Sequence, residues 1–161
     1  MSSPAASSNV VITPQQFLAH WQGHRRVTRR TIEAFPADKL FTHSIGGMRT
    51  FGDLAREMLG MATPTVAGIL TDKWGKYEVA AASTKEEVLA QWDAITTELD
   101  ARFPEIPIAR FQETKTAFGQ WTMPVYDLLL YVVDNEIHHR AQGYVYLRSL
   151  GIEPPPFYDR S

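Results

Sequence analysis

Three polar side chains interrupt apolar helical stripes in this 161-residue sequence, and their chemical types suit acid–base or metal chemistry. Asn135 and His139 stand four residues apart, which places them on one face of a helix with Cβ atoms about 5–6 Å apart. Glu57 breaks an apolar stripe of an earlier segment in the same way. Because a buried carboxylate without a partner is costly, we expect Glu57 to meet a cation, a donor or a metal, with His139 as the first candidate.

Two interpretations of these three residues stay open from their spacing. They can form a satisfied hydrogen-bond cluster that fixes the register of two helices, or they can serve as an acid–base or metal site. His20 and His24 also stand four residues apart, but no third ligand accompanies them. We therefore expect His24 at the edge of the core and His20 near the surface.

A run of arginines follows these histidines, Arg25-Arg26 and Arg29-Arg30. Such a run is typical of a solvated helix face. The alternative is that the arginines hold an anionic substrate at the rim of a pocket.

Four helices must position these side chains. Apolar residues at steps of three and four, with threonine caps before the first three segments, predict helices over 13–35, 50–70 and 84–103. Thr122-Met-Pro124 is expected to open the last and longest helix, which ends at Leu150 before a glycine. The residues from 108 to 121 are irregular, and a short hairpin and an ordered loop are equally compatible with them.

These elements predict an all-α fold, a four-helix bundle with long loops after the second and third helices. Pro64 is expected to kink or end the second helix unless the helix restarts there. We expect residues 1–12 to form a mobile N-terminal tail, residues 13–155 the bundle, and residues 156–161 a C-terminal tail.

Composition excludes several classes of protein. The chain has 16 Lys and Arg against 18 Asp and Glu, so a nucleic-acid partner is not expected. The absence of cysteine excludes disulfides, zinc ribbons and thiol nucleophiles. No apolar run approaches the ~20 residues of a spanning helix, and the N-terminus lacks the pattern of a signal peptide. We therefore expect a cytoplasmic protein without a membrane partner.

The last helix resembles that of a known family. Residues 135–142 read Asn-Glu-Ile-His-His-Arg-Ala-Gln, and residues 147–155 read Leu-Arg-Ser-Leu-Gly-Ile-Glu-Pro-Pro. They resemble the C-terminal helix of the DinB-like proteins, bacterial damage-inducible bundles related to thiol-dependent transferases and to mycothiol-dependent maleylpyruvate isomerase. A looser match covers residues 50–61. The resemblance implies a four-helix bundle, often dimeric, that commonly holds a divalent metal on three histidines. Together with the number of aromatic residues, it predicts a homodimer.

Carried over residue by residue, the three metal-ligand positions of the family fall on Glu57, Asn135 and His139, so only one of them is a histidine. The resemblance then implies a metal-dependent hydrolase or thiol-dependent transferase whose reduced site holds one weakly bound zinc, nickel, manganese or iron ion, or none. Its substrate would be a small molecule such as a thiol. The alternative is a non-catalytic bundle, a small-ligand-binding or stress-related dimer in which the polar cluster is structural.

Overall fold

Each of the first three helices begins at a threonine cap, as the sequence predicts. Thr13, Thr50 and Thr84 each accept a hydrogen bond from the backbone N–H three residues further on, which satisfies one amide left free at a helix start. The computed structural model describes residues 10–161, so most of the predicted N-terminal tail lies outside the described residues. The long helices are α1 (Pro14–Ala34), α2 (Phe51–Thr71), α3 (Lys85–Arg102) and α4 (Val125–Ser149).

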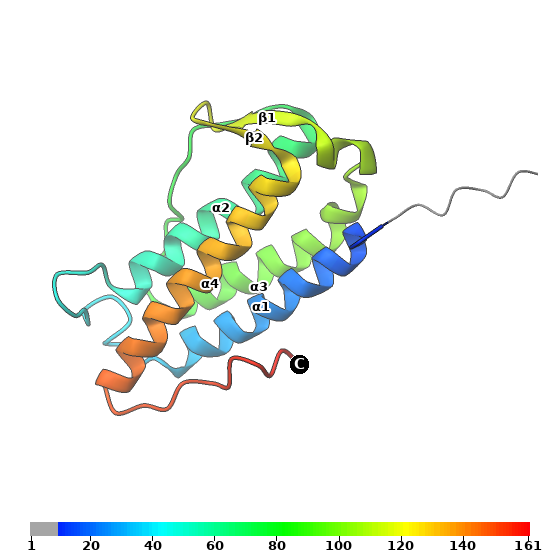
Figure 1. Ribbon diagram of the computed structural model, residues 1–161. Coiled ribbons are helices and arrows are strands. Elements are labelled where there is room, and N and C mark those ends of the chain that lie inside the picture. Colours follow the sequence, from blue (N-terminus) through cyan, green and yellow to red (C-terminus); the bar gives the residue numbers. More distant parts are fainter. Residues whose placement is uncertain (1–9) are drawn as a thin grey trace, which may run out of the picture.

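The predicted four-helix bundle is confirmed (Figure 1). Helix α1 packs on α3 and α4, and helix α2 packs on the same two helices. Around the bundle the order is therefore α1–α3–α2–α4, with α4 packed against α1 on one side and α2 on the other. No helix in the described part of the chain is long and apolar enough to cross a membrane.

Helix α2 does not end at Pro64 but continues to Thr71. Proline lacks an N–H group, so it leaves the carbonyl four residues earlier without its helical partner. Buried side chains lie on both sides of the proline, among them Met61 and Val66. Their packing holds the helix together across the missing hydrogen bond.

A small hairpin occupies the segment before α4 and extends into the residues expected to open that helix. Two short 3₁₀ helices, η1 (Phe103–Glu105) and η2 (Ile108–Gln112), lead into strands β1 (Thr114–Ala117) and β2 (Trp121–Pro124). Thr122 pairs with Thr116 in this antiparallel ladder, and their hydroxyl oxygens lie 2.8 Å apart. The prediction that Thr122 opens the helix is therefore wrong, because the strand uses this residue.

The apolar core is divided into two halves along the bundle. One half lies toward the hairpin and includes Trp21, Phe103 and Leu129. The other half lies toward the opposite end and includes Phe51 and Tyr146. On α1 and α4 the residues between these halves carry most of the polar side chains discussed below, while Glu57 of α2 lies within the half that includes Phe51. A polar layer thus crosses the middle of the bundle.

Replacing Gly143 by alanine is expected to destabilise the protein by about 1–3 kcal/mol. A Cβ atom at this position would lie 2.5 Å from the ring of Phe51, which is fully buried and stacks on Phe35. The ring has no space to move, so overpacking outweighs the roughly 1 kcal/mol that alanine gains over glycine within a helix. Urea unfolding measures the change.

The control is Gly75→Ala, since a Cβ atom at Gly75 would meet no atom within 4 Å. Its stability should stay within about 0.5 kcal/mol of the wild type. A Gly143 variant as stable as the wild type would contradict the close approach of α2 and α4.

Candidate functional site

The structure brings Glu57, Asn135 and His139 together between α2 and α4. The Nε2 atom of His139 lies 2.9 Å from Oε1 of Glu57. The Asn135 amide donates to the same oxygen at 3.1 Å, and its nitrogen lies 3.3 Å from His139 Nε2. Three polar atoms from two helices therefore face one point.

Antiparallel packing of α2 on α4 produces this meeting. Phe51 at the start of α2 lies under Gly143 near the end of α4, so Glu57, nearly two turns further along α2, reaches Asn135 and His139. His139 is almost enclosed, with 7% of its side chain exposed, whereas Glu57 retains 18%. The carboxylate is thus partly open to solvent.

Arg49, which was not predicted from the sequence, supplies the positive charge beside Glu57. Its Nη1 atom lies 2.5 Å from Oε2 of the carboxylate, and Tyr146 holds the Arg49 backbone by donating to its carbonyl at 2.9 Å. Burial by itself raises the pKa of Glu57, but hydrogen bonds from His139, Arg49 and Asn135 outweigh it and lower that pKa to about 2. Glu57 is therefore an anion at neutral pH.

The imidazole of His139 has an acceptor at each nitrogen. Oε1 of Gln142 lies 3.1 Å from Nδ1, and the Glu57 carboxylate faces Nε2. If Nδ1–H donates to Gln142, a neutral ring presents the lone pair of Nε2 to a carboxylate oxygen, and two acceptors repel at this distance. A proton or a cation must then lie between Nε2 and Glu57.

Metal ligation by these three residues requires the Asn135 amide to turn, because its nitrogen, which is not a metal ligand, faces Glu57 and His139. Around an ion with ligand distances of about 2.1 Å, neighbouring ligand atoms lie roughly 3.0–3.4 Å apart, close to the 2.9 Å between His139 Nε2 and Glu57 Oε1. Oδ1 of Asn135 is buried and has no hydrogen-bond partner among the described residues. A half-turn of the amide would place this oxygen beside His139 and Glu57. Between residues 10 and 161 no group of three His, Cys, Asp or Glu residues could hold a metal, so a site here needs Asn135.

A small polar hollow of about 280 Å³ adjoins this cluster. Arg49 and Gln142 line it, and each also contacts a member of the cluster. Glu57, Asn135 and His139 do not line the hollow themselves, so Arg49 and Gln142 separate it from the carboxylate.

A second polar network, on the α1 side of α4, was not predicted from the sequence. Glu136, 4% exposed, accepts from the Thr28 hydroxyl at 2.6 Å and from the Trp21 indole at 3.3 Å. Arg140 donates to the carbonyl of His24 at 3.1 Å and faces its Nδ1 at 3.0 Å. Burial raises the pKa of Glu136. Burial and then Arg140 lower the pKa of His24 to about 4, so His24 is a neutral acceptor.

The prediction of a solvated face is wrong for Arg25, while Arg26 is exposed and Arg29 and Arg30 are partly exposed. Arg25 is 1% exposed; its guanidinium lies 4.1 Å from the centre of the Trp92 ring and donates to the Trp92 carbonyl. His24 is likewise buried within the core rather than at its edge, while His20 is exposed as expected. The other arginines bind α3 and the C-terminal segment: Arg29 pairs with Asp93, Arg30 with Asp159, and Arg26 donates to the carbonyl of Arg160.

Comparison with known proteins agrees with this architecture. A family model described as the DinB family matches residues 1–161. A DinB-like protein from Bacillus cereus ATCC 10987 has a TM-score of 0.66 at 18% identity, covering 89% of this chain and 97% of that one. A DinB-like protein from Bacillus subtilis has a TM-score of 0.70 at 18% identity, covering 91% and 99%. At this identity the two structures show the fold alone. No curated protein sequence matches the chain.

Replacing Glu57 by glutamine should lower the free energy of unfolding at pH 7 by roughly 1–3 kcal/mol, because charged hydrogen bonds are lost; partial exposure favours the lower end. The pKa of Glu57 is about 2 in the folded protein against 4.5 ordinarily. The carboxylate's contribution is therefore complete above pH 4.5 and is lost as the pH falls toward 2. The difference in the free energy of unfolding between wild type and variant should therefore shrink as the pH falls from 4.5 toward 2.

Urea unfolding at several pH values measures this difference. The matched control is Glu153→Gln, whose side chain is 85% exposed. If the difference in the free energy of unfolding between wild type and Glu57→Gln stays constant between pH 5 and pH 3, the assigned hydrogen bonds are contradicted.

Proposed function

This chain belongs to the DinB family, and we propose that it is a metal-dependent hydrolase or thiol-dependent transferase with a reduced, weakly binding metal site at Glu57, Asn135 and His139. One observation carries the proposal. His139 Nε2 and Glu57 Oε1 lie 2.9 Å apart, with the Asn135 amide within 3.3 Å of both. When Nδ1–H donates to Gln142, Nε2 and Oε1 are both acceptors, and a proton or a cation must lie between them.

The chain's own residues divide the work of such a site. His139 would offer Nε2 and Glu57 would offer Oε1, while Asn135 would offer its carbonyl oxygen, which has no hydrogen-bond partner within residues 10–161. Gln142 Oε1 would accept a hydrogen bond from His139 Nδ1–H and thereby fix the tautomer that leaves the Nε2 lone pair free. Arg49 holds the other oxygen of Glu57 and restricts the carboxylate to one ligating atom. A bound divalent ion would supply an acidified water or thiol near neutral pH.

The three ligand atoms also determine how tightly the site would bind a metal ion and which metal it would prefer. Imidazole suits zinc and nickel, whereas carboxylate and amide oxygens suit harder ions such as manganese. With two good ligands and one amide, the site should have no strong zinc preference and should lose its metal readily. The adjoining polar hollow would receive a small substrate such as a thiol.

A non-catalytic bundle is the second candidate, and the position of Arg49 favours it. Its guanidinium already balances the charge of Glu57. If His139 donates an Nε2–H hydrogen bond to Glu57 Oε1, the pair is complete without a metal. The protein would then be a small-ligand-binding or stress-related bundle, with the cluster serving to fix the register of α2 and α4.

Homodimerisation and a cytoplasmic location stay proposals as well. The dimer is motivated by four Trp, eight Phe and six Tyr in a chain of this size, together with family membership. Sedimentation at micromolar concentration tests it. A single species near 18.2 kDa would contradict it.

Protein purified without a histidine tag and without added metal is expected to be substantially free of metal after dialysis against a chelator, because two good ligands hold an ion weakly. The double variant Glu57→His with Asn135→His should raise zinc affinity by at least roughly tenfold, since it supplies two imidazoles beside His139. Elemental analysis and zinc titration measure both. One tightly held zinc or nickel ion per wild-type chain would contradict the weak site.

The control for the double variant is an added His138→Asn change, which removes an exposed neighbouring histidine and should leave zinc uptake intact. An added His139→Ala change should abolish the uptake. Manganese titration of the wild type separates the two candidate functions. Saturable binding that Glu57→Gln removes supports the metal enzyme, whereas no binding at millimolar manganese supports the non-catalytic bundle.

A further inference from the structure

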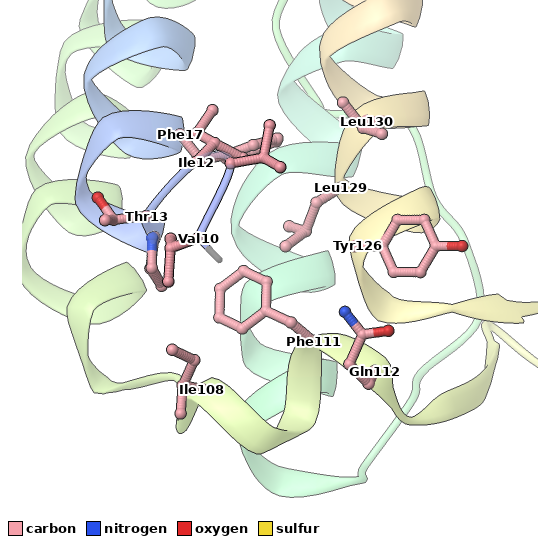
Figure 2. Close-up of a pocket in the computed structure, with 12 residues that line it drawn as sticks. Val10, Ile12, Thr13, Phe17, Ile108, Phe111, Gln112, Tyr126, Leu129 and Leu130 are labelled. Atoms are coloured by element: carbon pink, nitrogen blue, oxygen red, sulfur yellow. The ribbon is translucent and has the colours of Figure 1, made fainter. Parts of the chain in front are cut away.

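An apolar cavity of about 450 Å³ opens between the N-terminal ends of α1 and α4 (Figure 2). Four segments enclose it: residues 10–12, the start of α1, the 3₁₀ helix η2, and the start of α4. Its volume lies within the ~300–1,000 Å³ typical of small-molecule sites. No member of the Glu57 cluster lines this cavity, so it is separate from the proposed metal site.

The lining combines buried core residues with large apolar side chains that solvent reaches. Phe17 and Leu129 belong to the core, with 8% and 0% exposed. In Figure 2 the Phe111 ring lies in the middle of the lining, with Val10 and Tyr126 on opposite sides of it. Of the thirteen large hydrophobic residues exposed in the described chain, six line this one cavity: Val10, Val11, Ile12, Ile108, Tyr126 and Leu130.

Exposed apolar side chains gathered around one hollow indicate a binding site rather than an ordinary surface. The exposed fraction reaches 98% at Val11 and 70% at Ile108, and no charged side chain contributes to the lining. A charged ligand would lose its hydration there without gaining a partner. The cavity therefore suits a neutral ligand.

We propose that this cavity binds a small, uncharged and predominantly apolar molecule, such as an aromatic or branched aliphatic compound. The amide of Gln112 makes no side-chain hydrogen bond within residues 10–161 and stands in the lining, whereas the Tyr126 hydroxyl points away from Phe111 in Figure 2. The Gln112 amide is available to one polar group of the ligand. Few polar groups in an apolar lining are what orient ligands in small-molecule sites.

The concave shape favours a small molecule over a second copy of the chain. A stable interface between copies needs a total buried area of more than about 1,000 Å², whereas this lining curves inward from four segments to the core residues Phe17 and Leu129. A ligand of cavity size can contact the core residues and the exposed rim at once.

The test uses N-phenyl-1-naphthylamine, an uncharged apolar dye whose fluorescence rises when it leaves water, titrated into the full-length protein. Saturable binding of one dye per chain is expected. Leu130→Glu places a carboxylate in the lining at a position 44% exposed and should weaken the dye's affinity at least roughly tenfold. Zinc uptake by the double-histidine variant, measured in the same background, should not change.

The matched control is Val145→Glu, which introduces the same charge on α4 at a residue 58% exposed and outside the lining. Equal losses in both variants would overturn the proposal, because the dye would then adsorb to apolar surface in general. Unchanged affinity in Leu130→Glu would overturn it as well. A wild-type dimer that Leu130→Glu dissociates, seen by sedimentation, would assign the face to a second copy instead.

Discussion

The burial of polar side chains on both sides of α4 is the constraint on which the rest of the bundle depends. Asn135 and His139 face α2. The residue that follows each of them in the sequence, Glu136 and Arg140, faces α1 instead. A buried polar group is costly unless it is hydrogen-bonded, so each neighbouring helix must present matching groups at this level. The two apolar halves of the core are then placed on either side of the polar layer.

The two glutamates of this layer, Glu57 and Glu136, have pKa values that their surroundings shift in opposite directions. Hydrogen bonds from His139, Arg49 and Asn135 overcome burial at Glu57 and hold its pKa at about 2. At Glu136 full enclosure dominates, and its pKa is raised although Arg25 and Thr28 oppose the rise. Glu57 is thus ionised at neutral pH near a polar hollow. Glu136 instead joins α4 to α1 through its hydrogen bonds with Thr28 and Trp21. Groups whose environments push their pKa values apart commonly have different roles.

The sequence predicts the helices well because their signals are local. Threonine caps and apolar stripes define α1, α2 and α3, and the same stripes place Glu57, Asn135 and His139 on facing sides of α2 and α4. Arg49 escaped prediction because it belongs to a loop without periodicity, and only the tertiary fold brings it to Glu57. Glu136 and Arg140 escaped because a single buried stripe was assumed for α4, whereas α1 and α2 cover two of its faces. His24 and Thr28, polar residues on the inner stripe of α1, were the sequence feature that indicated polar partners on α4.

The network between α1 and α4 also bears on the order in which the bundle assembles. Its hydrogen bonds join residues 108 to 116 positions apart, and closing so long a loop carries an entropic cost that short-range contacts avoid. Until α4 docks on α1, Glu136 and Arg140 keep their water, and no partly assembled form gains from desolvating them. We expect this docking to be a late event in folding and its reversal to be the first large opening of the native state. The hydrogen bonds that fix how α1 packs on α4 would then also set the rates at which the bundle folds and opens.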